Sequence, residues 1–440
     1  MNDLRRRIKE QALDIFRNSV ASVDPKAVVR HALSELADEI GKSARICVVG
    51  IGKAALPMVE AARETMADRI TDCIALTKYG HGNKAARFEV IEAGHPIPDE
   101  NGAAATERII DMVKATAPED LVLVLLSGGG SALTSLPAEG LTLADLAHTN
   151  RLLIDSSADI RQINTVRKHL SVFSGGRLAQ YARPARLVSL ILSDVVGDDV
   201  SAIASGPTAP DTTTFADALD VLNTYGLTKR VVPPVLQHLA AGAEGRVPET
   251  PKPGDPVFEG VTNIVVASAA TALVAAQQRA VDLGFSAFVL SSSFAGDTHE
   301  LARFHAAIAR EVRRYGRPLA PPACLISGGE TTVTVTGSGK GGRNTEFALA
   351  FARETDGIRG IFGLFCGSDG TDGPTDAAGA FTAFDTVALA REKGLDARDY
   401  LKNNDSYTFF HALGDLVVTG PTRINVMDIR LVFITPEVAG

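Results

Sequence analysis

Short apolar segments alternate with stretches of helical periodicity along the whole chain. Runs such as Leu121–Leu126 and Ile361–Phe365 are almost entirely apolar, and segments of helical length separate them. Because strands covered on both faces have this continuous apolar character, the pattern predicts an α/β protein. The predicted strands are Ile46–Val49, Cys73–Thr77, Phe88–Ile91, Leu121–Leu126, Leu187–Leu192, Asn263–Ala267, Ala287–Leu290, Ala323–Ile326, Thr331–Thr336, Ile361–Phe365 and Ile429–Phe433.

The length of 440 residues is too great for a single hydrophobic core. Residues 240–260 are rich in Gly, Pro and charge and lack periodicity, which is typical of a domain boundary. We therefore predict a Rossmann-like α/β/α domain over residues 1–250 and a smaller α/β domain over 251–440. Thr331–Thr336 alternates with period two, so the second domain is expected to contain an antiparallel or edge strand and hence a mixed sheet.

The composition excludes several classes of protein. The net charge is -8 and there is no tryptophan, whereas a nucleic-acid binder usually has a basic face and aromatic residues for stacking. No apolar run reaches the length of a membrane span, and the basic amino terminus continues as an amphipathic helix rather than a signal peptide. The four cysteines lie in predicted strands or, for Cys366, directly after one, and they lack a zinc-ligand spacing, which indicates reduced thiols. We expect a cytoplasmic protein without nucleic-acid or membrane partners.

The first glycine-rich turn follows the strand Ile46–Val49. Gly50 and Gly52 allow a close approach of the backbone, and Lys53 adds a positive charge at the start of the next predicted helix. The turn also satisfies the dinucleotide pattern G-x-G-x-x-A, but no acid follows the strand Cys73–Thr77 to hold a ribose. We favour an anion site here over an NAD(P) site; a purely structural turn is the third interpretation.

A second glycine-rich loop follows the strand Leu121–Leu126. Three successive glycines can place backbone N–H groups around a phosphate, and the flanking serines add hydroxyl donors. The alternative is a flexible turn without a ligand. A similar Ser-Gly-Gly sequence follows Ala323–Ile326, so we expect such a loop at a strand end in each domain. The candidate phosphate-binding residues of the first loop are Ser127, Gly128, Gly129, Gly130 and Ser131.

Carboxylates gather after two of the predicted strands. Asp194 follows Leu187–Leu192, and Asp369 and Asp372 lie in a glycine-rich loop after Ile361–Phe365. Asp-Gly pairs are common in turns, and this is the simpler interpretation. Crowded acids, however, repel one another unless a cation neutralises them. The pattern therefore favours Mg²⁺ binding or a general base, the two roles that phosphoryl transfer needs carboxylates for.

Three basic side chains are candidates for binding an anion. Arg343 opens a predicted helix, where the helix dipole disfavours a cation, so a carboxylate or phosphate partner is expected; the alternative is a surface arginine. Arg167 lies in a basic segment that could equally be a solvated helix face. His95 lies in a proline-rich turn, where it either lines a site or caps the turn.

Taken together, these segments resemble the class II glycerate kinase family, the glycerate 2-kinases whose carboxyl-terminal domain is called MOFRL. The resemblance implies two α/β domains with the active site in the cleft between them, and a MOFRL region over about 320–430. It implies MgATP-dependent phosphorylation of D-glycerate at the 2-hydroxyl, with Lys53 and Arg343 lining the cleft. The matching stretches are Val49–Ala55, Leu126–Ser131, Ile163–Gly176, Leu192–Asp199, Ser205–Thr208, Ser327–Thr331, Gly341–Glu346, Gly367–Gly379 and Asn403–Tyr407.

On this basis each candidate residue receives an expected role. The alternative function is an NAD(P)H-dependent hydroxypyruvate reductase, a name that some relatives carry. A homodimer is compatible with the sequence. The expected roles are catalysis for Lys53, Asp194 and Arg343; ATP binding for Gly50, Gly52, Ser127, Gly128, Gly129, Gly130 and Ser131; substrate binding for His95, Arg167, Glu330 and Asn344; and Mg²⁺ binding for Asp194, Asp369 and Asp372.

Overall fold

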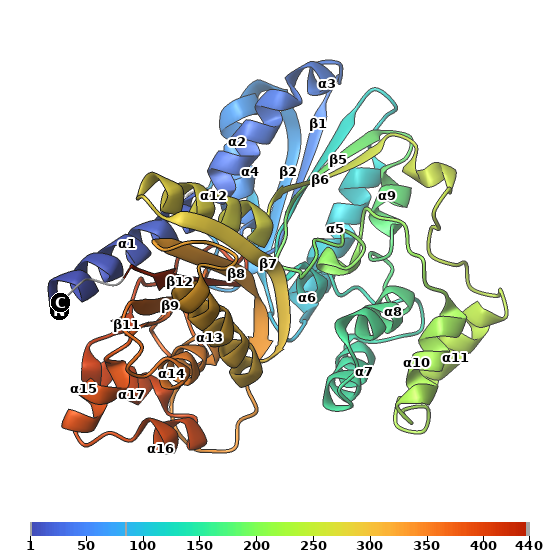
Figure 1. The fold of residues 1–440 in the computed structure, drawn as a ribbon. Coiled ribbons are helices and arrows are strands. Elements are labelled where there is room, and N and C mark those ends of the chain that lie inside the picture. Colours follow the sequence, from blue (N-terminus) through green and yellow to red (C-terminus); the bar gives the residue numbers. More distant parts are fainter. Residues whose placement is uncertain (1, 84–85, 437–440) are drawn as a thin grey trace. The chain divides into compact units, whose positions relative to one another are not determined.

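The computed structural model describes residues 2–83 and 86–436, which form two compact units (Figure 1). One unit is the continuous segment Pro25–Val266, and we call it the amino-terminal unit. The other, the carboxyl-terminal unit, combines the described parts of Met1–Asp24 and Ala267–Gly440. These ranges differ from the predicted domains 1–250 and 251–440 at both ends.

The first difference concerns helix α1 (Asn2–Ala21), which belongs to the carboxyl-terminal unit. Its apolar face, including Phe16, is buried, and the helix packs against α12 (Ala269–Asp282). The hydroxyl of Ser19 donates a hydrogen bond of 2.7 Å to the carbonyl oxygen of Ala272. This packing joins residues more than 250 positions apart, and helical periodicity alone cannot reveal it.

The second difference concerns the irregular segment around residue 250. It leads into strand β6 (Val261–Ala267), which lies beside β5 (Arg186–Leu192) in the first sheet. The division therefore falls at the last residue of β6, because the strand that follows the irregular segment still completes the sheet of the amino-terminal unit.

The sheet of the amino-terminal unit has the strand order β3-β2-β1-β4-β5-β6, and its strands from β3 to β5 run parallel. Helices α2 and α4 pack on one face, and α5 and α9 on the other (Figure 1). The order reverses between β1 and β4, which makes their carboxyl ends a switch point of the kind where ligands bind. The bounds are β1 Ile46–Ile51, β2 Ile70–Lys78, β3 Glu89–Ala93, β4 Leu121–Leu126, α2 Pro25–Glu35, α4 Ala55–Met66, α5 Glu100–Lys114 and α9 Arg177–Ala182.

Four further helices of this unit, α7, α8, α10 and α11, pack around an apolar core of their own. Leu153, Val166 and Phe215 are fully buried in it. The bounds are α7 Leu143–Asp155, α8 Ile160–Leu170, α10 Phe215–Thr224 and α11 Pro233–Ala243, with short helices α3 Ala37–Gly41, η1 Ala67–Arg69, α6 Gly130–Leu133, η2 Ile203–Ser205 and η3 Pro256–Phe258.

The sheet of the carboxyl-terminal unit is mixed, as predicted, with the order β11-β10-β9-β12-β8-β7. Only β7 and β8 pair in parallel, and the other pairs are antiparallel. Helix α1 contacts strands β9 and β12, and α12 contacts β7, β8 and β12. Helices α13 and α14 pack against each other over the sheet (Figure 1). The bounds are β7 Ser286–Asp297, β8 Ala323–Thr332, β9 Ile361–Gly367, β10 Gly379–Ala383, β11 Leu416–Val417, β12 Asp428–Ile434, α13 Thr298–Tyr315, α14 Arg343–Glu354, α15 Thr386–Glu392, α16 Ala397–Lys402 and α17 Ser406–Leu413.

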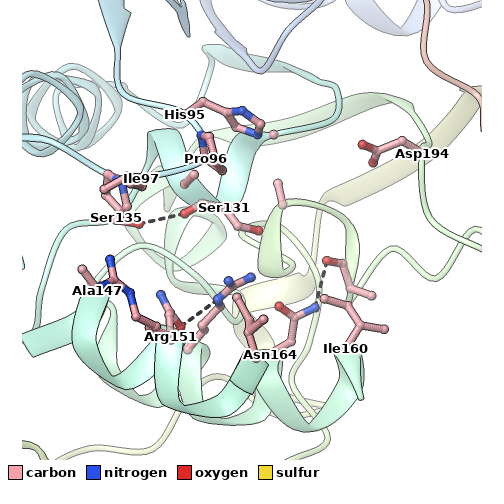
Figure 2. A pocket seen from close by; sticks show the side chains of 18 of the residues that line it. His95, Pro96, Ile97, Ser131, Ser135, Ala147, Arg151, Ile160, Asn164 and Asp194 are labelled. Carbon is pink, nitrogen blue, oxygen red and sulfur yellow. Dashed lines mark hydrogen bonds between the residues drawn. The ribbon is translucent and has the colours of Figure 1, made fainter. Parts of the chain in front are cut away.

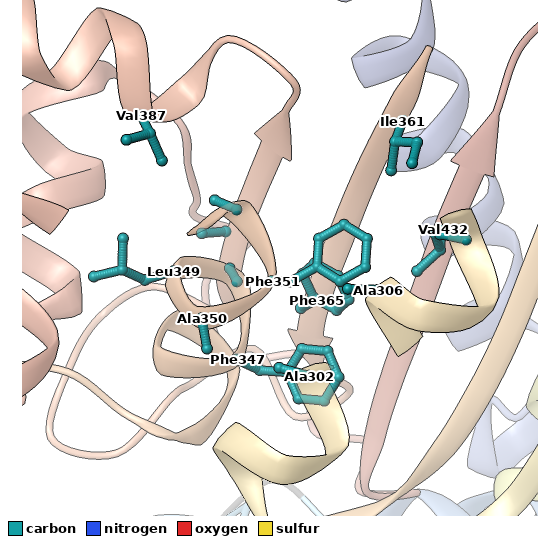
Figure 3. Packing of buried hydrophobic residues seen from close by; sticks show 14 of the residues in the cluster. Ala302, Ala306, Phe347, Leu349, Ala350, Phe351, Ile361, Phe365, Val387 and Val432 are labelled. Carbon is teal, nitrogen blue, oxygen red and sulfur yellow. The ribbon is translucent and has the colours of Figure 1, made fainter. Parts of the chain in front are cut away.

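Aromatic side chains fill the core between α14 and the sheet (Figure 3). The rings of Phe347 and Phe351 lie 4.7 and 5.1 Å from the ring of Phe365 on β9, between centroids. The small side chains of Ala302 and Ala306 on α13 belong to the same core. These contacts fix α14, and with it the residues at its amino-terminal end.

Two expectations for this unit are wrong. Ser327, Gly328 and Gly329 lie inside β8 rather than in a loop, and residues 333–336 are not a strand. Gly329 is needed because a Cβ there would lie 2.1 Å from the carbonyl oxygen of Phe294 on the neighbouring strand. β8 lies between β12 and β7 and pairs antiparallel with β12, so the expected antiparallel or edge strand is present as an antiparallel one. The short strands β10 and β11 were not predicted.

Within the described residues, no helix is long and apolar enough to cross a membrane. The four cysteines are free thiols, and Cys47, Cys324 and Cys366 are buried, which agrees with the predicted reduced state.

Candidate active site

The loops after β1 and β4 are joined by backbone hydrogen bonds at the switch point. The N–H of Lys53 donates to the carbonyl oxygen of Gly128 at 2.9 Å, and the N–H of Ala54 donates to the hydroxyl of Ser127 at 3.0 Å. Gly52 has φ +118°, and a Cβ there would lie 2.3 Å from the carbonyl oxygen of Ser127. Only glycine fits at this position. The two loops thus form one rigid layer.

Two of the predicted ATP-binding residues make structural contacts. Gly50 lies within β1, and a Cβ there would lie 2.4 Å from Cγ2 of Val59. Its absence lets α4 pack closely on the strand. Ser127 is 1% exposed and accepts the bond from Ala54, so its hydroxyl braces the two loops. Gly50 and Ser127 therefore support the two loops.

Three predicted side chains converge on the next two glycines. A Cβ at Gly128 would lie 2.0 Å from Oδ2 of Asp194. A Cβ at Gly129, which has φ +90°, would lie 3.0 Å from Nε2 of His95 and 3.5 Å from Cε of Lys53. The loop is therefore glycine-rich because a carboxylate, an imidazole and an ammonium side chain all lie against its backbone.

A strained turn supports the other side of this loop. Ala204 and Ser205 both have left-handed backbone angles, φ 50° and 59°, which cost non-glycine residues of order 1 kcal/mol each. A Cβ at Gly130 would lie 2.7 Å from the Cβ of Ala204. The hydroxyl of Ser205 hydrogen-bonds the hydroxyl of Ser131 at 2.8 Å. Such strain is retained where the surroundings fix it, typically at functional sites.

A cavity of about 490 Å³ opens beside these groups (Figure 2). One wall is made by α7 and α8, and the other by the turn after β3, the start of α6 and the residues after β5. The structure thus brings five sequence-predicted residues to one cavity. They are His95, Gly129, Ser131, Arg167 and Asp194.

Arg167 carries a mostly buried positive charge. Its Nε donates a hydrogen bond of 2.9 Å to the amide oxygen of Asn150, a neutral partner, and it forms no ion pair with any described residue. Burial lowers the pKa of Arg167. The last turn of α8 offers some compensation through the helix dipole, but this is small beside the cost of burying a cation. An anionic ligand would supply the missing counter-charge.

His95 is an uncharged group of the site. Burial, together with the positive charge of Lys53, lowers the pKa of His95 to about 4. The imidazole is therefore neutral near pH 7 and can donate or accept a hydrogen bond without adding charge.

The carboxyl-terminal unit holds a separate group of predicted residues around Arg343. Its Nε lies 2.9 Å from both carboxylate oxygens of Asp428, and its Nη1 lies 3.0 Å from Oε1 of Glu330. Burial alone would lower the pKa of Arg343, but the charge of Asp428 outweighs it and raises the pKa above the ordinary value. The expected acidic partner at this helix start is thus Asp428.

Asn344 joins the same cluster. Its amide nitrogen donates to Oδ1 of Asp428 at 2.9 Å, while its amide oxygen is buried and makes no hydrogen bond within the described part of the chain. This amide oxygen could therefore accept a hydrogen bond from a ligand.

The expected Mg²⁺ role does not fit Asp372. Its carboxylate accepts bonds from the N–H groups of Asn344 and Thr345 at 2.9 and 2.8 Å and from the Thr345 hydroxyl at 2.8 Å. It is 2% exposed and caps α14. Asp369 accepts bonds from the N–H and hydroxyl of Thr371, so it shapes a turn through one oxygen. No three His, Cys, Asp or Glu side chains among residues 2–83 and 86–436 are placed to hold a metal.

Several residues of these clusters were missed by sequence reasoning. Arg151 of α7 and Asn164 of α8 line the cavity, and Asp428 holds Arg343. The sequence does contain a signal for the two helices, because the residues of each that line the cavity are spaced as on one helix face. These positions are 147, 151 and 154 in α7 and 160, 164 and 167 in α8. Asp428 gives no such signal, since it is the first residue of the apolar strand β12.

The chain matches two protein-family models and is similar to known proteins over most of its length. Residues 11–240 match the model of DUF4147, a domain of unknown function, and residues 323–428 match the MOFRL family. A glycerate 2-kinase of Pyrococcus horikoshii is 40% identical over 98% of this chain and 98% of its own. A protein of Agrobacterium vitis provisionally named as a hydroxypyruvate reductase is 44% identical over 96% and 93%, respectively. The solved structure of glycerate kinase from Thermotoga maritima is 41% identical, covers 98% of this chain and 100% of its own, and superposes with a TM-score of 0.90.

Proposed function

Because the chain belongs to the glycerate kinase family that joins a DUF4147 domain to a MOFRL domain, we propose that it phosphorylates D-glycerate at the 2-hydroxyl with ATP. The observation that carries this proposal is the convergence of Lys53, His95 and Asp194 on Gly128 and Gly129. Phosphoryl transfer depends on positioning and on charge stabilisation, and this arrangement supplies both around a backbone loop.

The glycine loop is the proposed phosphate site. Gly129 lines the cavity, and the side chain of Lys53 lies against it and supplies positive charge there. The imidazole of His95 is neutral near pH 7 because its pKa is lowered to about 4, and its N–H can donate one hydrogen bond to a phosphate oxygen. Asp194, which lies against Gly128, is the proposed acceptor of the proton that leaves the hydroxyl of glycerate.

Arg167 is the proposed partner of the glycerate carboxylate. Its side chain is partly buried without an acidic partner in the described structure, and a carboxylate would neutralise it with paired hydrogen bonds. In the carboxyl-terminal unit, we propose that Arg343, Glu330 and Asn344 serve the same reaction. The expected cleft between the two domains stays a prediction.

Mg²⁺ fits the residues of the amino-terminal unit in part. A magnesium ion bound with ATP needs only one or two protein carboxylates, because phosphate oxygens and water complete its shell. Asp194 is half-buried beside the glycine loop and suits this role, and Asp369 is the remaining candidate of the other unit. When bound, the ion would neutralise the charge on the phosphate oxygens.

A coupled assay with purified protein tests the proposal. ADP release should require both glycerate and Mg²⁺, and Lys53→Ala and Arg343→Ala should each lower kcat/KM at least tenfold. The exposed Lys42 offers a matched control, and Lys42→Ala should leave turnover unchanged. Oxidation of NADH with hydroxypyruvate, without any need for ATP, would instead favour the reductase.

We also propose a cytoplasmic location. The four cysteines form no disulfide, which suits a reducing compartment. A homodimer stays a prediction, to be checked by light scattering.

A further inference from the structure

Three exposed isoleucines border the cavity of the amino-terminal unit. Ile97, Ile154 and Ile160 line it, and they are 63%, 58% and 53% exposed. Figure 2 shows Ile97 and Ile160 among the lining residues. Single exposed apolar residues are ordinary, but three large ones around a single cavity form an apolar rim. An uncovered apolar rim of this kind marks a surface that a ligand covers.

The rim is held by rigid parts of the unit. Ile97 lies between two prolines, Pro96 and Pro98, which restrict the backbone of the turn. Ile154 lies in the last turn of α7, and Ile160 is the first residue of α8. The opposite faces of both helices are packed in a buried core. The rim is therefore preformed, which reduces the entropy lost when a ligand binds.

The rim continues directly into the polar part of the same cavity. Gly129 and Ser131 of the glycine loop line that cavity together with the three isoleucines. A ligand that fills it should therefore have an apolar body at one end and an anionic group at the other. Glycerate is a three-carbon acid without an apolar body, whereas the base of a nucleotide is flat and largely apolar on its faces.

We infer that the apolar rim of Ile97, Ile154 and Ile160 binds the nucleoside part of ATP, while the triphosphate extends to the glycine loop. The inference rests on the proposed kinase activity and adds the location of the nucleoside. A cavity of about 490 Å³ lies within the range that accommodates ligands of this size. Because the rim does not touch the reacting atoms, it should strengthen ground-state and transition-state binding equally.

The double variant Ile154→Ser/Ile160→Ser tests this inference. Both side chains are more than half exposed, so their loss should leave the fold intact. The variant should raise KM for ATP about tenfold, with kcat and KM for glycerate unchanged. The matched control is Val274→Ser on α12, an equally exposed apolar residue of the other unit, which should not change any of the three.

A binding measurement without glycerate completes the test. Titration calorimetry with Mg²⁺ should show weaker binding of ATP to the double variant but equal binding of inorganic tripolyphosphate, which lacks the nucleoside. An unchanged affinity for ATP, an equal loss for tripolyphosphate, or a rise in KM for glycerate alone would overturn the inference. If the wild-type protein binds ATP at this rim but does not phosphorylate glycerate, the proposed function fails and the nucleoside subsite stands.

Discussion

The carboxylate of Asp194 lies directly against the backbone of Gly128, since a Cβ on that glycine would come within 2.0 Å of Oδ2. The two residues follow different strands, β5 and β4, which are neighbours in the parallel sheet. Because the strands hold both loops, the carboxylate has a fixed position beside the proposed phosphate site.

Gly128→Ala should displace the carboxylate of Asp194. The added methyl group cannot occupy the same space as Oδ2, and a shift of about 1 Å at a catalytic group costs about 10²-fold in rate. We expect kcat to fall by about this factor while the protein stays folded by circular dichroism. Gly41→Ala is the control, because no atom lies within 4 Å of a Cβ there and its activity should be unchanged. Equal activity of both variants would contradict the placement of Asp194.

Arg167→Met should weaken the binding of glycerate. The variant removes a partly buried cation that lines the cavity, and a charge-assisted hydrogen bond contributes about 1.5–3 kcal/mol, so KM for glycerate should rise at least tenfold. KM for ATP should change little. Arg161→Met, on an exposed position of the same helix, provides the comparison. A rise in KM for ATP alone would assign Arg167 to the nucleotide instead.

Asp372→Ala should lower stability rather than the affinity for Mg²⁺. It leaves the buried N–H groups of Asn344 and Thr345 without their acceptor, so the free energy of unfolding should fall by about 2 kcal/mol in a denaturant titration. The dependence of the remaining activity on Mg²⁺ concentration should be unchanged. Asp396→Ala, which removes the exposed cap of α16, should cost less. A higher requirement for Mg²⁺ would show that Asp372 binds the metal after all.

The stability of the protein should fall with acid between pH 6.5 and 4. Burial lowers the pKa of both His95 and His305 from 6.5 to about 4, so the unfolded chain binds protons more readily than the folded one. Protonation below pH 6.5 therefore favours unfolding. Denaturant midpoints measured across this range should decline, and His95→Gln should make the decline less steep. An unchanged slope in this variant would show that His95 titrates normally in the folded protein.

Much of the fold follows from local sequence signals. The apolar runs and glycine turns predicted most strands and the position of the first loop, because strand burial and backbone conformation depend on neighbouring residues. Asp194 was found for the same reason, since it directly follows an apolar strand. The placement of α1 could not be predicted, because its apolar face shows that it is buried but not which element covers it.

The roles of single residues depend on contacts that the sequence does not contain. Gly50 and Gly52 look alike in the chain, yet the first allows a helix to pack on β1 and the second allows a loop to pass Ser127. Asp369 and Asp372 lie in the same glycine-rich loop, but only the second reaches the start of α14. Such differences arise from three-dimensional packing between distant segments.

The most direct test of phosphoryl transfer at the Lys53 and Asp194 site is turnover of Asp194→Asn, followed by phosphorus NMR of the product. The wild-type protein should form 2-phosphoglycerate in equal amount with ADP. The variant keeps the shape of the side chain but cannot accept a proton, so its kcat should fall by about 10²–10⁴-fold while ATP still binds. Turnover by Asp194→Asn at the wild-type rate, or a wild-type protein that forms no phosphoglycerate, would contradict the proposed site.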